Sequence, residues 1–319
     1  MGHDPTKLKR SIISIVGIQA RLFILLATEA PLGVVIRRGP SSQVLLIKWD
    51  LESDTFEHGQ WLKARVYERR CDLSPDGNLI LYFASDQRRA MSSWTALSCP
   101  PYFTALALWP KNNTYGGGGV FESRSKVLLD RQEWEEGHVA EGFSIPNWLS
   151  VGLLGRRGGW EDFDLSSPWS LRLRRDGWEL MQHPINTKDK FGEKMKLELD
   201  PPLVWQKAHP VRPDNFAIQM SVLGIGGQNR PSVVTAHRLV GKDGYLGQIG
   251  ESDWSDWAPN GDLLFAQAGC LFRLRCRDGE FGPIEQSEQI ADFNALEFRS
   301  CEAPETARSW PKSTSKSRD

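Results

Sequence analysis

Short runs of apolar residues, separated by polar turns, recur along most of the chain. Three of them follow one another near the N-terminus, at residues 22–27, 33–37 and 44–49, and Pro, Gly and Ser separate them. Runs of this length, rich in Val, Ile and Leu and bounded by turn residues, are typical of β-strands. The same pattern predicts further strands at residues 61–67, 79–83, 103–109, 216–223, 233–240 and 270–276.

The segment from Ser170 to Leu180 also fits a strand pattern. Leu171 and Leu173 alternate with arginines, and Asp176-Gly177 follows as a hairpin signal. The sequence therefore predicts a hairpin here, and an all-β chain overall.

One stretch of the sequence occurs twice. In Cys71–Phe83, CDLSPDGNLILYF, a polar turn leads into an apolar strand. Asp256–Leu264, DWAPNGDLL, is a weaker copy of this design 184 positions later. Pro presets φ for the first central position of a turn, Asp or Asn bonds its own backbone, and Gly supplies a positive φ. The apolar run after the first turn predicts a strand covered on both faces. Four repeats of about 46 residues would fill the interval.

The Ser-Pro-Asp-Gly turn and the strand after it resemble the repeat of the TolB-like and WD40-like β-propellers. The resemblance implies an all-β fold, a β-propeller of about five to six four-stranded blades. A pair of β-sandwiches is the alternative fold. It covers two segments of the chain and implies the fold more than the function. For ring closure, we expect residues 22–27 to share a blade with residues 296–298.

Residues 21–300 are therefore expected to form the propeller, after an N-terminal extension at 1–20 and before a disordered tail at 301–319. The tail is rich in Pro, Ser, Thr, Lys and Arg. Residues 7–27 have a basic start and an apolar run, so export is the alternative to a cytoplasmic location. No apolar stretch is long enough for a membrane span.

Composition narrows the possible partners. The chain has 39 Lys and Arg against 40 Asp and Glu, a formal charge of −1, so no nucleic-acid partner is expected. Neither the five Cys nor the six His follow a metal-ligand spacing, and we expect no metal, no cofactor and reduced thiols. The 13 Trp are expected mainly in the core. Oligomeric state is left open.

Four consecutive glycines, Gly116–Gly119, follow the strand at 103–109. They lack the Lys and Ser or Thr of a phosphate-binding loop, so a close approach of the backbone to its neighbours is the better interpretation. Arginine pairs recur along the chain, and gathered on one face they could bind an acidic partner; the alternative is dispersed, solvated strand edges. The pairs are Arg37-Arg38, Arg69-Arg70, Arg88-Arg89, Arg156-Arg157 and Arg174-Arg175.

No recognisable catalytic set of residues occurs, which favours a non-enzymatic interaction scaffold that binds a protein partner through one loop face. The alternative is a propeller hydrolase of glycans or peptides that uses carboxylates from residues 130–165. Asp76 is expected to shape its turn only. The candidate binding residues on the loop face are Trp109, Tyr115, Arg156, Arg157 and Trp160.

Overall fold

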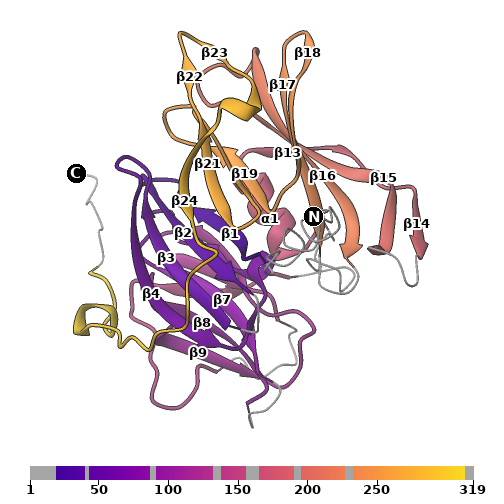
Figure 1. Cartoon of the computed structure of the whole chain (residues 1–319). Coiled ribbons are helices and arrows are strands. Elements are labelled where there is room, and N and C mark those ends of the chain that lie inside the picture. Colours follow the sequence, from indigo (N-terminus) through magenta and orange to yellow (C-terminus); the bar gives the residue numbers. More distant parts are fainter. Residues whose placement is uncertain are drawn as a thin grey trace, which may run out of the picture.

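The computed structural model describes residues 19–39, 43–86, 91–131, 138–155, 165–189, 195–226 and 233–312. Within these residues the chain is almost entirely β, with the α-helix α1 at Pro168–Arg175. Consecutive segments of the chain build five sheets that form a five-bladed β-propeller (Figure 1). The predicted fold class is therefore confirmed, with the lower of the two expected blade numbers.

The first two blades follow the chain in simple antiparallel order. Blade 1 consists of β1 (Arg21–Leu26), β2 (Leu32–Arg38), β3 (Gln43–Asp50) and β4 (Thr55–Lys63). Blade 2 consists of β5 (Arg65–Val66), the 3₁₀ turn η1 (Glu68–Arg70), β6 (Asp72–Leu73), β7 (Ile80–Ser85), β8 (Ser93–Ser98) and β9 (Ala105–Lys111).

The other three blades are less regular. Blade 3 has β10 (Gly119–Ser123), β11 (Lys126–Leu129) and β12 (Ser150–Leu153). Blade 4 has β13 (Trp178–Gln182), β14 (Asn186–Asp189), β15 (Met195–Ala208), β16 (Phe216–Gly226), β17 (Val234–Gly241) and β18 (Gly244–Glu251). Blade 5 has β19 (Trp254–Trp257), β20 (Leu263–Gln267), β21 (Cys270–Leu274) and β24 (Glu288–Asp292). The pair β22 (Cys276–Arg277) and β23 (Glu280–Phe281) and the 3₁₀ turns η2 (Ile284–Gln286) and η3 (Glu305–Ala307) complete the described elements.

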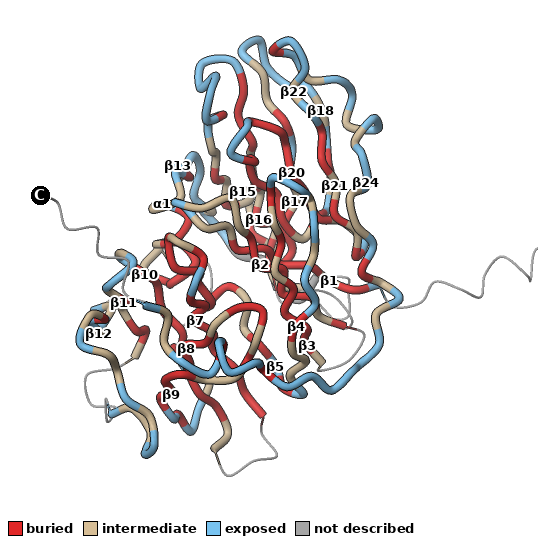
Figure 2. The backbone as a smooth tube through the Cα atoms, turned by 90° about the vertical axis from the view of Figure 1, so that its left-hand side faces the viewer, coloured by how far each residue is buried: buried red, intermediate tan, exposed pale blue. Residues whose placement is uncertain are grey.

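Apolar faces of neighbouring blades pack together around the ring. In β1, Leu22 and Ile24 face blade 5, whereas Phe23 and Leu25 face blade 2. Because successive side chains of a strand point to opposite faces, a strand covered on both sides needs a continuous apolar run. Strand β7 is likewise buried along its whole length, as the sequence predicted. Figure 2 shows the buried residues along the blade strands and the exposed ones at the turns.

Blades 5 and 1 meet where the two ends of the ring come together. The Nε of Arg37 donates to the carbonyl of Phe293 at 3.0 Å, and Leu296 packs against the cluster that contains Leu22. The two segments are therefore neighbours, as expected. They do not share a blade, because residues 22–26 belong to β1 of blade 1, whereas residues 296–298 follow the last strand of blade 5 and form no strand.

The predicted hairpin at 170–180 is wrong in its first half, which forms α1. Ser167 caps this helix by accepting a hydrogen bond from the backbone N–H of Ser170, and Pro168 occupies the first turn. Gly177 follows the helix with φ +85°, a conformation that favours glycine after a helix. These capping signals outweigh the alternation of Leu and Arg. Helix α1 joins blade 3 to blade 4, and Arg175 donates to the carbonyl of Phe121 at 3.0 Å.

The two copies of the repeated stretch are three blades apart, not four repeats. The first supplies β6 of blade 2 and the second supplies β19 of blade 5. Blade 4 lengthens the interval because it has six strands, one of which spans 14 residues. The turn itself is as predicted: Asp76 accepts hydrogen bonds from Ser74 Oγ at 2.6 Å and from the backbone N–H of Asn78.

The chain from residue 301 to 312 packs against the propeller, so the expected disordered tail does not begin at 301. Ala303 and Ala307 are buried, and the Trp310 ring lies edge-on to Trp148. The indole N–H of Trp310 donates to the carbonyl of Ser144. Residues 313–319, like residues 1–18 of the expected N-terminal extension, lie outside the described residues.

The glycine run forms a close backbone approach, as predicted. A Cβ on Gly118 would lie 1.9 Å from the carbonyl oxygen of Arg70, and one on Gly117 would lie 2.4 Å from the Phe83 ring. The backbone N–H groups of both glycines are used internally, by Asp130 and by Thr95. The glycines therefore allow close packing against their neighbours, and the N–H groups of Gly117 and Gly118 are not available to bind an anion.

Candidate functional site

A cavity of about 480 Å³ lies in the middle of the ring. Four of the five blades and α1 contribute to its wall, so we call it the central cavity. Its charged and histidine residues are Arg69, Asp72, Arg172, Arg175, Asp176, Lys207, His237, Asp253 and Asp256. Its aromatic residues are Phe23, Trp169, Trp178, Trp254 and Trp257. The wall therefore combines aromatic rings with a larger number of charged or histidine side chains, and polar groups that converge on a concave site can orient a small molecule.

The repeated stretch places an aspartate in this wall twice. Asp72 and Asp256 are equivalent positions in the two copies of the turn motif, and both are buried. Each accepts a hydrogen bond from the backbone N–H of the residue after it, at 2.9 Å and 2.7 Å. Since both lie on short strands beside the cavity, the repeat carries a pair of buried carboxylates as well as a turn.

Asp72 is held by a two-pronged ion pair with Arg175 of α1. The two guanidinium nitrogens lie 2.5 Å and 3.0 Å from its carboxylate oxygens, and the backbone N–H of Phe121 donates at 2.7 Å. Burial raises the pKa of Asp72, and Arg175 opposes this effect. Burial also disfavours the charged form of Arg175, but Asp72 and Asp176 outweigh it and raise the pKa of Arg175. The two hydrogen bonds between opposite charges hold this pair rigidly.

Asp256 has a different cation as its partner. The Nζ of Lys207, on β15, donates to its carboxylate at 2.6 Å. Burial raises the pKa of Asp256, and Lys207 opposes the shift. Arg172 of α1 is buried without an ion-pair partner among the described residues; it donates to the carbonyl of Cys71 and lies 5.1 Å from the centre of the Phe23 ring. Burial lowers the pKa of Arg172.

His237 is oriented by a short hydrogen-bond chain. Its Nδ1 lies 2.8 Å from the Oγ of Ser252, and this hydroxyl donates to the carbonyl of Gly250 at 3.0 Å. With the Ser252 proton on this carbonyl, which only accepts, Nδ1 of His237 carries the proton that bonds to Ser252. Nε2 is then a hydrogen-bond acceptor. Burial lowers the pKa of His237 to about 3, so the ring is neutral near pH 7.

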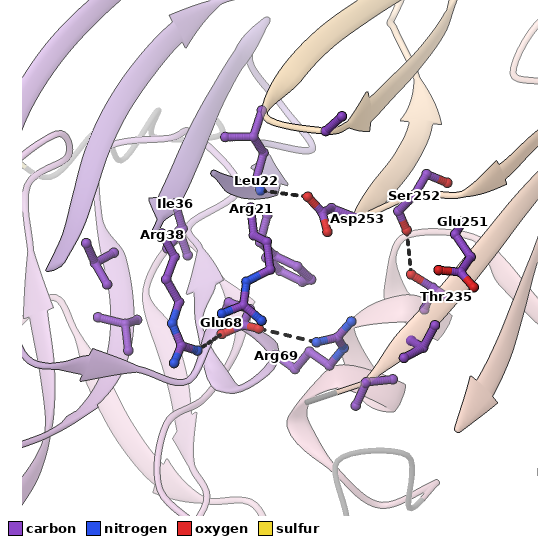
Figure 3. A pocket seen from close by; sticks show the side chains of 16 residues that line it. Arg21, Leu22, Ile36, Arg38, Glu68, Arg69, Thr235, Glu251, Ser252 and Asp253 are labelled. Atoms are coloured by element: carbon purple, nitrogen blue, oxygen red, sulfur yellow. Dashed lines mark hydrogen bonds and ion pairs between the residues drawn. The ribbon is translucent and has the colours of Figure 1, made fainter. Parts of the chain in front are cut away.

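Asp253 is the carboxylate best placed for chemistry. It lines both the central cavity and a smaller one. One carboxylate oxygen accepts the backbone N–H of Leu22 at 3.0 Å, and no other hydrogen bond or ion pair holds it among the described residues. Burial raises its pKa to about 6, against the opposing effect of the Leu22 N–H, Arg21 and Arg69. Figure 3 shows this side chain at the edge of the smaller cavity.

The smaller cavity has a volume of about 140 Å³, and three arginines line it; we call it the arginine cavity. Arg21 and Arg38 come from neighbouring strands of blade 1, and Arg69 comes from η1 (Figure 3). Glu68 lies 3.9 Å from Arg38 and 3.3 Å from Arg69. Phe23, Arg69, Thr235 and Asp253 line both cavities, which places them next to each other.

Two of the five predicted binding residues, Trp109 and Tyr115, lie in the described part of the chain. Trp109 is buried among the apolar residues between blades 2 and 3, which takes its side chain away from any loop face. Tyr115 is 64 % exposed. Arg156, Arg157 and Trp160 lie outside the described residues, so a binding role for them, as for Tyr115, stays a prediction.

The carboxylates expected for a hydrolase are mostly outside the described residues as well. This applies to Glu135, Glu136, Glu161, Asp162 and Asp164; Glu141 is described and exposed. No cluster of three or more His, Cys, Asp or Glu side chains suited to a metal ion occurs in the described part of the chain. All five cysteines are free thiols, as predicted.

Several arginines of the recurring pairs make contacts inside the propeller or line its cavities. Arg37 joins blades 1 and 5, and Arg70 holds the glycine loop through the carbonyls of Thr114 and Gly116. Their neighbours Arg38 and Arg69 line the arginine cavity, and Arg175 lines the central one. These arginines are therefore interior residues and do not form a solvated edge.

Comparisons with known proteins show no family for this chain. No protein-family model and no curated protein matches this chain. Among solved structures, a candidate 6-phosphogluconolactonase of Bacteroides uniformis is 12% identical, with 86% of this chain and 99% of that chain covered and a TM-score of 0.30. An uncharacterised protein of Listeria monocytogenes is 10% identical, with 87% and 84% covered and a TM-score of 0.31. At such scores the likeness carries no argument about function.

No helix in the described segments is long and apolar enough to cross a membrane.

Proposed function

We propose that the protein binds a small polyhydroxylated or amino-substituted molecule in the central cavity. The observation that carries this proposal is the wall of the cavity, where His237 and Asp253 provide hydrogen-bond acceptors beside aromatic rings. A neutral imidazole Nε2 and a loosely held carboxylate both pair with hydroxyl or amine groups. Aromatic faces such as those of Trp254 and Trp257 supply apolar contact area for the rest of the ligand.

The rigid ion pairs serve this site by shaping it. Asp72 with Arg175, and Asp256 with Lys207, fix α1, β6, β15 and β19 around the cavity. Breaking a buried pair leaves an unpaired charge, which costs several kcal/mol, so the wall cannot easily rearrange. A preformed cavity binds its ligand with little loss of conformational freedom.

The experiment is a binding screen with Asp253→Asn and a control variant. Neutral sugars, polyols, amino sugars and amino acids are tested by thermal shift and titration calorimetry. We expect one class to bind the wild type and Asp243→Asn alike, since Asp243 is exposed on the β17–β18 turn. Asp253→Asn should bind it at least about tenfold more weakly, the effect of losing one charge-assisted hydrogen bond. Equal affinity in both variants would contradict the proposal.

Hydrolysis of the bound molecule is the narrower possibility within the same cavity. With a pKa of about 6, about a tenth of Asp253 is protonated at pH 7, enough for a general acid. The hydrolase alternative from the sequence relied on other carboxylates. It is tested by incubating each ligand found in the screen with the protein and following its decay, with Asp253→Asn as the inactive control.

A scaffold role is the second candidate, because one end of blade 4 exposes apolar side chains. Val211, Tyr245 and Leu246 are 64 %, 60 % and 51 % exposed, and they lie on adjacent turns where Phe216 pairs with Gly241. Large apolar residues that cluster at an exposed edge often contact another protein. A partner captured at fixed stoichiometry by the wild type, and lost when Tyr245 and Leu246 are both changed to Ser, would support this role. Unchanged capture by that variant would oppose it.

A further inference from the structure

Three arginines, Arg21, Arg38 and Arg69, line the arginine cavity together with three carboxylates, Glu68, Glu251 and Asp253. Arg21 and Arg38 are direct partners across the β1–β2 ladder, a position where like charges repel. Arg69 joins them from η1, and Glu68 is their nearest carboxylate (Figure 3). Burial lowers the pKa of Arg38, and Arg21 and Arg65 add to that effect while Glu68 opposes it.

Two of these guanidinium groups have donors to spare. The guanidinium of Arg21 makes no hydrogen bond and no ion pair with any residue that the structure describes. Arg38 touches Glu68 only at 3.9 Å, which is too long for a hydrogen bond, and its Nε is buried without a partner in the described chain. A buried donor without a partner is costly, so its presence beside a cavity points to a ligand.

Asp253 makes no ion pair with these arginines among the described residues. Its carboxylate is turned to the Leu22 backbone, and its pKa of about 6 shows that burial outweighs the effect of Arg21 and Arg69 on it. Glu251, which also lines the cavity, is exposed. Among the described residues, the guanidinium of Arg21 and the Nε of Arg38 therefore have no hydrogen-bond acceptor in the cavity wall.

We propose that the arginine cavity binds the anionic group, a carboxylate or a phosphate, of a small molecule between Arg21 and Arg38. Planar guanidinium groups bind both kinds of oxyanion through paired hydrogen bonds. The cavity of about 140 Å³ holds one such group and adjoins the central cavity. This inference rests on the proposed function in one respect: the rest of the ligand is the polyhydroxylated or amino-substituted part bound in the central cavity.

The test uses simple anions, so that it does not depend on finding the whole ligand. Inorganic phosphate and malonate are titrated separately into the full-length protein at constant ionic strength, and calorimetry gives the affinity. We expect Arg21→Gln and Arg38→Gln to weaken binding by about 10- to 100-fold, the range for one charge-assisted hydrogen bond. The control is Arg277→Gln, which changes an exposed arginine on β22 and should leave the affinity within twofold.

Glu68→Gln gives a result of opposite sign. Because it removes the carboxylate that competes for Arg38 and Arg69, it should strengthen anion binding. The two arms identify the anion: tighter binding of phosphate than malonate indicates a phosphorylated ligand, and the reverse indicates an organic acid. A folded Arg21→Gln or Arg38→Gln protein that binds both anions like the wild type would overturn the inference, as would a wild type that binds neither.

The proposed function can fail independently. If neutral sugars or amines bind in an Asp253-dependent manner while phosphate and malonate do not bind, the anion inference is wrong and the central-cavity proposal stands. If the anions bind through Arg21 and Arg38 but no organic molecule from the screen depends on Asp253, the opposite conclusion follows.

Discussion

Replacing Asp253 with Asn should change how the stability of the protein depends on pH. Asp253 has a pKa of about 6 in the folded protein, against 3.8 for an unperturbed aspartate. The folded state therefore binds this proton more tightly than the unfolded state does. The stabilising contribution is complete below pH 3.8 and is lost as the pH rises through 6.

The size of the effect follows from these two pKa values. A shift of about two units corresponds to about 3 kcal/mol over the full range, at about 1.4 kcal/mol per unit. Between pH 4.5 and pH 7.5, the part of the curve that is easily measured, the linkage relation leaves a change of about 2 kcal/mol. Asn does not titrate, and its side-chain oxygen can still accept the Leu22 N–H.

The assay is urea denaturation of wild type and Asp253→Asn at several pH values. The quantity to follow is the difference between their free energies of unfolding, because all other titrating groups, including His237, are common to both proteins. Arg21, Arg69 and Glu68 are the charged groups that act on Asp253. We expect Asp253→Asn to gain about 2 kcal/mol relative to wild type from pH 4.5 to 7.5. A difference that stays constant, or that moves in the opposite direction, would refute the reasoning.

Three further variants test the architecture by denaturation. Arg175→Gln should lower the free energy of unfolding by about 3–5 kcal/mol, because it leaves the buried Asp72 unpaired. The control Arg124→Gln removes an exposed ion pair and should lower it by less than about 1 kcal/mol. Similar losses in the two variants would contradict the structural role of the Asp72–Arg175 pair. Gly118→Ala should lower the unfolding midpoint strongly, since its Cβ meets a backbone carbonyl at φ +79°, and a neutral result would mean that the loop can shift. Trp310→Ala should lower the free energy of unfolding by about 1–3 kcal/mol, because Trp310 holds the C-terminal segment against Trp148 and Ser144. An unchanged free energy of unfolding would mean that this segment does not stabilise the propeller.

The strands were predictable from the sequence because their signal is local. Strand β7 is buried on both faces, and a strand of this kind must be apolar at every position. The turn at Ser74 was also predictable, since its Ser, Pro, Asp and Gly each favour a turn through a hydrogen bond or a preferred backbone angle. Helix α1 was missed because alternating Leu and Arg also fits a strand, although Ser167-Pro168 and Gly177 were capping signals that could have identified it.

The site was not predictable in the same way, because its members come from distant parts of the chain. His237 and Ser252 meet only through the pairing of β17 with the end of β18, and Arg175 reaches Asp72 across 103 positions. One signal was present: Asp72 and Asp256 occupy the same place in both copies of the repeat. Both aspartates lie among buried residues, and a charged side chain is almost never buried unless it is paired. Their repeated position therefore indicates a paired carboxylate as well as a turn.

The charged groups around the two cavities differ in how strongly they are already paired within the protein. Asp72 and Asp256 already have their cations at 2.5 Å and 2.6 Å, so a ligand would gain little by competing for them. Arg21, Arg38 and Asp253 are each held by weak contacts or by a single hydrogen bond. Because a group that lacks strong partners gains most from a new one, recognition should depend on these three residues. Variants of the rigid pairs should then alter stability more than affinity, and variants of the loosely held residues should alter affinity more than stability.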